Sequence, residues 1–243
     1  MPSGSIAAMI QARLDAGFSR AGAETGAERS RKLSEGEMIR WLMEFSTCNL
    51  SDALDALELS GTPRGFLPLW PGCGKAAGKA MTIHLVPEGR DSAVEGTLRA
   101  IMAAESGDVL VIDNGGRLDV NSFGGIAAFT AQRRGLAGVI IDGVTRDLEE
   151  MREMIFPAYG KGAIQQSIRG RCAFGGFGGE MRLGGVVVRR GDYVAADENG
   201  VVVFPAERAA EVMEDARRCF EREEQIKRWI GAGVDPVEAH QRA

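Results

Sequence analysis

Histidine, paired cysteine and long apolar runs are all scarce in this sequence. The 243 residues include two histidines, His84 and His240, and four cysteines with no Cys-x-x-Cys pair. Zinc sites rely on histidine and cysteine, so a His-rich zinc site is nearly excluded. Any metal site must use carboxylates and water, which favours Mg²⁺ or Mn²⁺. Scattered cysteines without a disulfide framework are typical of reduced thiols in a cytoplasm.

The sequence also lacks the marks of membrane and nucleic-acid-binding proteins. No apolar run approaches the roughly 20 residues that span a bilayer, and the N-terminus has no basic and apolar signal segment. The net charge is −5, the pI is near 5.3, and no basic segment is long enough to indicate a nucleic-acid face. We therefore expect a cytoplasmic protein that acts on a small molecule, with neither a membrane nor a nucleic-acid partner.

Composition divides the chain into three regions. Residues 1–33 combine a helix-spaced apolar start with a stretch rich in glycine, alanine, serine and charge, which predicts an N-terminal extension with a linker. Residues 34–205 form the main domain, and residues 206–243 form a C-terminal helix and tail. Because 44% of the residues are hydrophobic, the chain can build one sizeable core without a second domain.

Helices and strands alternate through the main domain. The capping box at Ser34 opens one helix, and Ser46, Thr47 or Asn49 caps the next. Helices are predicted at 92–104, 125–134 and 146–154, with a long one from Pro205 to about residue 229. Strands are predicted at 80–86, 109–113, 139–142, 186–189, 193–196 and 201–204, with a turn at 114–116. The glycine-rich stretch 170–185 is predicted to be a flexible loop.

The order of these elements predicts a mixed α/β fold. Strands 109–113 and 139–142 are joined by one helix, and such a βαβ unit places its strands parallel. The short late strands are joined by the tight turns at residues 191–192 and 199–200, which indicates antiparallel additions. The sequence therefore predicts one α/β domain with helical arms at both ends.

Arg146 and Asp147 are the first candidate site, because they directly follow the apolar strand 138–142. Chemistry in α/β folds gathers at such strand ends. Arginine offers a bidentate fork for a carboxylate or an enolate oxygen, and aspartate offers hard oxygen for a divalent cation. The alternative is a surface ion pair, or an aspartate that interacts with a helix dipole.

Gly124 and Gly125 are the second candidate, because they precede the helix 125–134. The amides of Ile126 and Ala127 then lie in the first turn, where backbone N–H groups have no helical partner and bind carboxylates or phosphates. The alternative is that the two glycines only make a turn.

Residues 45–205 resemble the RraA-like family, over about two thirds of the chain. The family signature is a glycine, twenty residues, Arg-Asp, two residues and an acid. Gly125, Arg146, Asp147 and Glu150 satisfy it. Flanking matches support the resemblance at 47–55, which looks like the opening helix, at 107–113, which looks like the strand before the glycine turn, and at 191–205, which looks like the late hairpin.

The resemblance implies a swivelling β/β/α layered fold with a mixed sheet. It implies a class II aldolase that cleaves a 4-hydroxy-2-oxo acid to pyruvate, decarboxylates oxaloacetate, or does both. Asp147 would ligate Mg²⁺ or Mn²⁺ directly, with Glu150 in support. Arg146 would contact the carbonyl oxygen of the 2-oxo acid, and the amides of Ile126 and Ala127 at the Gly124-Gly125 turn would hold its carboxylate.

The resemblance also implies a homotrimer or homohexamer with the site at a subunit interface. Carboxylates of a neighbouring subunit would bind the metal through water. Asp52 is one candidate, and Glu223 is the other, with Glu221 as its near equal. The segment 206–243 would pack on that neighbour.

The chain departs from the family pattern at Gly125, where comparable enzymes often carry an acid. This departure leaves the oxo acid open, so a related lyase or decarboxylase with a different substrate is an alternative. A second alternative is a non-enzymatic regulator that binds an RNA-degrading endonuclease, as part of the family does. That branch lacks the Asp after the Arg, so Asp147 favours the enzyme.

Overall fold

The computed structural model describes residues 34–243, and the predicted extension of residues 1–33 lies outside the described residues. The domain boundaries of the three predicted regions stay a prediction. The helices are α2 (Glu35–Glu44), α3 (Thr47–Ala56), α4 (Ala93–Ala103), α5 (Gly125–Arg133), α6 (Leu148–Glu153), α7 (Ala209–Gly231) and α8 (Pro236–Arg242), with the 3₁₀ turn η1 (Ala206–Arg208). The strands are β1 (Leu67–Pro68), β2 (Ala76–Val86), β3 (Val109–Asn121), β4 (Gly138–Val144), β5 (Ala158–Gly160), β6 (Ala173–Phe177), β7 (Met181–Leu183), β8 (Val186–Val188), β9 (Tyr193–Asp197) and β10 (Gly200–Phe204).

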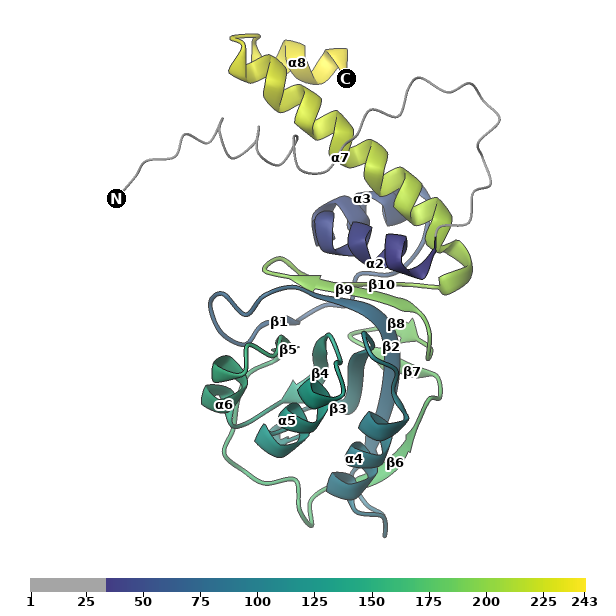
Figure 1. Cartoon of the computed structure of the whole chain (residues 1–243), viewed down its shortest axis with the longest axis vertical. Helices are drawn as coiled ribbons and strands as arrows, with labels where there is room; N and C mark the ends of the chain where they lie inside the picture. Colours follow the sequence, from purple (N-terminus) through teal and green to yellow (C-terminus); the bar gives the residue numbers. More distant parts are fainter. Residues whose placement is uncertain (1–33) are drawn as a thin grey trace. The chain divides into compact units, whose positions relative to one another are not determined.

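One mixed sheet organises these residues (Figure 1). Its strand order is β1-β5-β4-β3-β2-β9-β10, and β6 pairs with β2 beside β9. Strands β2, β3, β4 and β5 are parallel, whereas β1, β6, β9 and β10 are antiparallel to their neighbours. Strand β1 at one end of the order contacts β10 at the other, so the sheet curls back on itself. The predicted mixed α/β fold is confirmed.

The parallel half of the sheet holds the core. Every residue of β4 is buried, as expected for a parallel strand covered on both faces. Helices α4, α5 and α6 are the crossovers between β2, β3, β4 and β5. The carboxyl ends of these strands therefore share one edge, where the segment after β4 meets the start of α5.

Two glycine-rich segments are more regular than predicted. Residues 170–185 are not a flexible loop, because they contain β6 and β7, and β6 pairs with β2. Their glycines hide the strand pattern, and Gly175 shows why one of them is needed: an added Cβ there would lie 2.7 Å from the His84 ring. Residues 114–116 do not end β3 either, because the strand continues to Asn121 with irregular register.

Other boundaries differ by a few residues. The segment 146–154 begins its helix only at Leu148, so Arg146 and Asp147 precede α6. The predicted tail after the long helix contains a further helix, α8. Strands β1 and β5 were also missed, because runs of two and three residues show no periodicity.

Helices α2, α3 and α7 lie beyond the β9–β10 pair, on the side away from α4, α5 and α6 (Figure 1). Ser34 and Ser46 cap α2 and α3 through capping boxes, so Ser46 is the cap among the three predicted candidates. Helix α3 packs against α7 and β10. Helix α8 packs against α7, and the four helices α2, α3, α7 and α8 are together named the arm.

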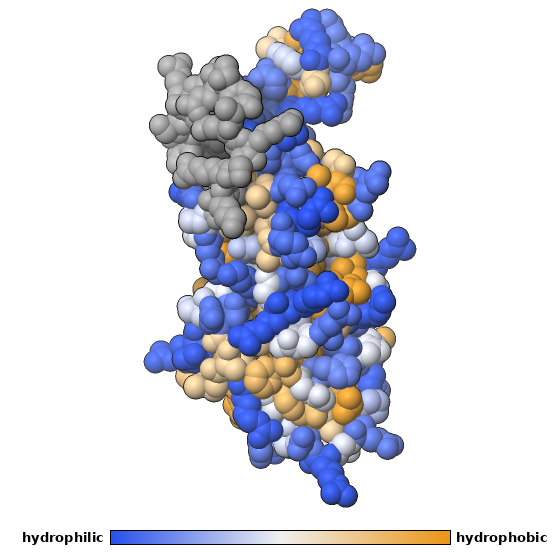
Figure 2. All heavy atoms as spheres, turned by 90° about the vertical axis from the view of Figure 1, so that its right-hand side faces the viewer, coloured by the Kyte–Doolittle hydropathy of each residue, from blue (hydrophilic) through white to orange (hydrophobic). Residues whose placement is uncertain are grey.

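The molecular surface shown in Figure 2 is mostly hydrophilic, with hydrophobic atoms in small separate patches. Within residues 34–243, no helix combines the length and the apolar character needed to cross a bilayer.

Candidate active site

The carboxyl end of β4 leads directly into Arg146 and Asp147. Thr145 is fully buried, and its Oγ1 donates to the carbonyl of Phe123 at 2.7 Å. Asp147 then adopts a left-handed conformation, with φ 60° and ψ 38°, which aspartate tolerates better than most residues. Arg146 Nε lies 3.4 Å from Asp147 Oδ2, and about a third of each side chain is exposed. The pair therefore stands at the strand end, as the sequence predicted.

The first turn of α5 faces this pair. Gly125 N donates to Asp147 Oδ2 at 2.9 Å. The next two amides, those of Ile126 and Ala127, have no protein acceptor within residues 34–243. Gly124 precedes the helix in an extended conformation, and its missing side chain leaves room for Asp147: a Cβ there would lie 2.8 Å from Asp147 Oδ2.

The carbonyl of Phe123 ties the two segments together. It accepts hydrogen bonds from Arg146 N at 3.2 Å and from Thr145 Oγ1. It also accepts from Asn121 Nδ2 at 3.1 Å. Three donors on one carbonyl hold the start of α5 and the end of β4 at a constant separation, so the free amides and the Arg-Asp pair are positioned by backbone geometry.

These groups line one cavity of about 240 Å³. Its walls come from α4, from the segment 121–127, from Arg146, Asp147 and Glu150, and from residues 167–169. A cavity of this size accommodates a small organic acid. It brings together Gly124, Gly125, Ile126, Ala127, Arg146, Asp147 and Glu150, which are all the residues that the sequence predicted on this side of the site.

Glu150 fills the space beside Gly125. A Cβ at position 125 would lie 2.1 Å from Glu150 Oε2, so any side chain there would displace the glutamate. A carboxylate thus occupies the place that an acid at position 125 would enter, although it comes from α6.

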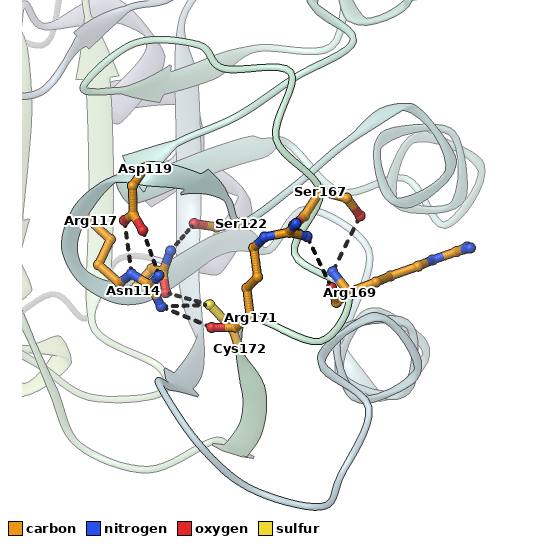
Figure 3. Close-up of polar contacts among 8 residues, drawn as sticks. All are labelled: Asn114, Arg117, Asp119, Ser122, Ser167, Arg169, Arg171 and Cys172. Carbon is orange, nitrogen blue, oxygen red and sulfur yellow. Dashed lines mark hydrogen bonds and ion pairs between the residues drawn. The ribbon is translucent and has the colours of Figure 1, made fainter.

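The hydrogen-bonded loop 167–171 contributes another wall of the cavity. Figure 3 shows Arg117 bound to both oxygens of Asp119, at 3.0 and 2.7 Å, while its Nη1 donates to the carbonyl of Arg171. Arg171 in turn donates to the carbonyls of Ser167 and Arg169. Arg169 extends away from the other labelled residues in this view, and its guanidinium has no partner in the described part of the chain.

The donor set fits a hard divalent cation with few protein ligands. Asp147 and Glu150 supply carboxylate oxygens to the same cavity, and Mg²⁺ commonly takes one or two carboxylates with the rest of its shell from water and substrate. No group of three or more acidic, histidine or cysteine side chains within residues 34–243 is arranged to hold a metal by itself. A cation bound by Asp147 and Glu150 would complete its coordination with further oxygens.

Asp52 and Glu223 do not line the cavity of their own chain. They lie on α3 and α7, where partial burial raises the pKa of the Cys219 thiol and the charges of Asp52, Asp215 and Glu223 raise it further. Asn49 Nδ2 donates to Glu223 Oε2 at 3.1 Å. Glu221 is instead paired with Arg217 at 2.6 Å. The choice between Glu223 and Glu221 stays a prediction.

Sequence reasoning missed the polar residues on the other cavity walls, which are Thr97, Asn121, Ser122, Ser167 and Arg169. Thr97 lies in the middle of α4 and Asn121 at the end of β3, and neither belongs to a motif. Only the folding of four distant segments around one cavity identifies them.

At the strand ends of this mixed α/β sheet, free helix amides, an arginine and two carboxylates line one cavity. The Aldolase/RraA family model matches residues 47–203, and the chain belongs to this RraA-like family. It is 31% identical over 197 residues to Protein DlpA of Legionella pneumophila. This match covers 81% of the chain but 32% of DlpA, so the chain spans about a third of the length of that relative.

Two further relatives match nearly over their whole length. The 4-hydroxy-4-methyl-2-oxoglutarate aldolase of Thermus thermophilus is 30% identical over 164 residues, covering 67% of this chain and 94% of that protein. The crystal structure of Streptomyces coelicolor RraAS2, described as an unusual member of the RNase ES inhibitor RraA protein family, aligns with a TM-score of 0.72. It is 27% identical and covers 80% of this chain and 98% of that one.

Proposed function

We propose that this protein is a divalent-metal-dependent carbon–carbon lyase that cleaves a 4-hydroxy-2-oxo acid and releases pyruvate. The observation that carries the proposal is the cavity in which Arg146, Asp147 and two unpaired helix amides meet. The relatives named as aldolases support the reaction class.

Different groups of this chain bind the substrate carboxylate and stabilise the negative charge that develops during cleavage. The amides of Ile126 and Ala127 bind the carboxylate of the substrate, because helix N-terminal donors and the dipole favour an anion. Arg146 donates to the 2-oxo oxygen. Breaking the C3–C4 bond leaves its electron pair on the pyruvate enolate, and a guanidinium already in place stabilises the oxygen that gains this charge.

Asp147 and Glu150 would hold the cation, Mg²⁺ or Mn²⁺. When bound, it supplies Lewis-acid polarisation of the 2-oxo group. Gly125 N holds Asp147 Oδ2 in position, and Glu150 stands beside Gly125 as the second carboxylate. The proton that leaves the C4 hydroxyl is matched by one that returns to C3, so the reaction needs no further reactant. Decarboxylation of oxaloacetate gives the same enolate and would use the same groups.

We propose further that the protein assembles as a homotrimer or homohexamer and acts in the cytoplasm. In the assembly, Asp52 and Glu223 of one subunit would approach the cavity of the next. The charges of Asp52 and Glu223 both raise the pKa of the Cys219 thiol, so the two carboxylates lie near one another on the arm, which supports this arrangement.

Pyruvate release tests the proposed function. Purified protein is given 4-hydroxy-4-methyl-2-oxoglutarate or oxaloacetate, with Mg²⁺, with Mn²⁺ and with excess EDTA. We expect turnover that EDTA abolishes, and we expect Arg146→Ala and Asp147→Ala each to remove it while the circular dichroism spectrum is unchanged. Full activity in either variant or in EDTA would sink the mechanism. Binding to an RNA-degrading endonuclease without any lyase activity would favour the regulator instead.

A further inference from the structure

Two buried polar atoms without a protein partner belong to residues that line the cavity. In the described part of the chain, four buried side-chain atoms lack a hydrogen bond: Thr97 Oγ1, Asn121 Oδ1, Asp142 Oδ1 and Arg146 Nε. Asp142 Oδ1 lies 2.6 Å from Lys161 Nζ, and Arg146 Nε lies 3.4 Å from Asp147 Oδ2, so both of these atoms are in ion pairs. The other two atoms, of Thr97 and Asn121, belong to residues that line the same cavity.

Buried polar groups in folded proteins nearly always have a partner, so two unpaired groups around one cavity indicate a ligand that supplies the partners. Asn121 Oδ1 is an acceptor and needs a donor, whereas the Thr97 hydroxyl both donates and accepts. Carbonyl and carboxylate oxygens cannot donate, so Asn121 requires a different group on the ligand.

The orientation of the Asn121 amide is set by its surroundings. Its Nδ2 donates to the carbonyl of Phe123 at 3.1 Å, which can only accept. A flipped amide would place two acceptors face to face. The oxygen of Asn121 is therefore the atom left unpaired, and the side chain is 3% exposed.

Thr97 departs from the usual behaviour of a helical threonine. Such hydroxyls commonly donate to the carbonyl one turn earlier, as Thr130 does to the carbonyl of Ile126 at 2.8 Å. Thr97 makes no such bond, although it is 3% exposed in the middle of α4. Its hydroxyl is thus a buried polar group that does not donate to the backbone carbonyl one turn earlier.

We propose that Thr97 and Asn121 form a hydroxyl subsite that binds the C4 hydroxyl of the substrate. The subsite selects hydroxylated 2-oxo acids over those without a hydroxyl at C4, and this proposal rests on the proposed function. The C4 hydroxyl donates to Asn121 Oδ1 and accepts from Thr97, which holds C4 in place for cleavage of the C3–C4 bond; the amide oxygen itself takes no proton. Oxaloacetate has no such hydroxyl and leaves both residues unpaired, so the subsite favours aldol cleavage over decarboxylation.

The test compares kcat/KM for 4-hydroxy-4-methyl-2-oxoglutarate with kcat/KM for oxaloacetate. Thr97→Val keeps the shape of the side chain and removes the hydroxyl, and we expect it to lower the ratio about tenfold. Thr97→Ser restores the hydroxyl and should restore most of the ratio. Asn121→Ala should shift the ratio in the same direction. Equal losses on both substrates, or no change in the ratio, would overturn the subsite.

The melting temperature of the free protein gives a second readout. Thr82 is the matched control, because it is also buried but its Oγ1 donates to the carbonyl of Gly179 at 2.7 Å. Thr82→Val should lower the melting temperature and leave the substrate ratio unchanged. Thr97→Val should keep or raise the melting temperature, since no internal hydrogen bond is lost. A fall as large as that of Thr82→Val would show that Thr97 has an internal partner and would contradict the proposal.

A binding experiment distinguishes this proposal from the proposed function. If neither acid is turned over, the lyase fails, and calorimetry then compares 4-hydroxy-2-oxoglutarate with 2-oxoglutarate, which differ by the one hydroxyl. The subsite predicts tighter binding of the hydroxylated acid, with the difference reduced about tenfold in Thr97→Val. Equal affinities in the unmodified protein would refute the subsite by itself.

Discussion

At the scale of single residues, the geometry of the site depends on two glycines as well as on its charged side chains. Gly124 lets Asp147 approach the start of α5, and Gly125 leaves the space that Glu150 occupies. Asp147 itself takes the left-handed conformation that aims its Oδ2 at Gly125 N. The glycines could be predicted to precede a helix, but the atoms that would collide with a Cβ belong to a segment more than twenty residues away.

Gly125→Ala tests this close approach. The new Cβ would lie 2.1 Å from Glu150 Oε2, and the flexible end of the glutamate can move, so we expect a loss of stability below about 1 kcal/mol. Turnover should fall about 10- to 100-fold, because the carboxylate leaves its position. Steady-state kinetics and urea unfolding measure the two effects.

Gly36→Ala is the matched control. Nothing lies within 4 Å of a Cβ at position 36, in the first turn of α2, so the change should stabilise the protein by about 0.5–1 kcal/mol and leave turnover alone. Unchanged turnover in Gly125→Ala would mean that the position of Glu150 does not matter.

At the scale of elements, α3 is anchored to the sheet by a carboxylate. Thr47 donates to Asp197 at the end of β9 twice, from its N at 2.7 Å and from its Oγ1 at 2.6 Å. Burial raises the pKa of Asp197, but the hydrogen bonds from Thr47 and Asn199 outweigh it, so the pKa lies below its usual value. The anchor holds the helix that carries Asp52.

Asp197→Ala should cost about 1.5–3 kcal/mol of unfolding free energy at pH 7, because it removes hydrogen bonds to a charged group. A carboxyl whose folded pKa is lowered stabilises the protein above its unfolded pKa of about 3.9 and loses this contribution as the pH falls through the folded pKa. The difference between the two proteins should therefore be constant from about pH 7 to pH 5 and shrink below about pH 4.

Urea unfolding across this pH range measures the effect. Asp55→Ala on the exposed side of α3 is the control and should change stability by less than about 0.5 kcal/mol at each pH. A difference for Asp197→Ala that grows on acidification would have the wrong sign and contradict the anchor.

Periodic elements were predictable at this scale, and aperiodic ones were not. β4 is an apolar run and α2 has a capping box, so both follow from local sequence. Two of the five residues of β6 are glycine and β5 has only three residues, so neither shows alternation. Both exist because a neighbouring strand supplies hydrogen-bond partners, which is information that a local pattern does not hold.

At the scale of the whole molecule, the carboxylates divide into two groups. Asp147 and Glu150 line the cavity at the strand ends. Asp52 and Glu223 lie on the arm, which is on the far side of β9 and β10 in Figure 1. If one site needs both groups, they must come from two subunits.

Mixed subunits test that division. Asp147→Ala and Asp52→Ala should each be inactive alone, because each removes a carboxylate from every site. Refolded together, they should recover measurable lyase activity, since some sites then combine an intact cavity with an intact arm. Size-exclusion chromatography with light scattering establishes the assembly in which this occurs.

The matched control mixes Asp147→Ala with Arg146→Ala. Both changes lie in the same cavity, so no new combination of subunits is intact and the mixture should remain inactive. Recovery in this control, or none in the first mixture, would mean that the arm does not complete a neighbour's site.

The sequence by itself determined the mixed α/β class, the family, and the Arg146-Asp147 and Gly124-Gly125 candidates, because periodicity, caps and motif spacing are local properties. Tertiary structure alone decided that these candidates share a cavity, that Glu150 stands where a side chain at position 125 would be, and that Thr97 and Asn121 have unpaired atoms beside it. The physical reason is that a hydrogen-bond partner, or the lack of one, depends on segments distant in sequence. The sequence of one segment does not specify which distant segments will pack around it.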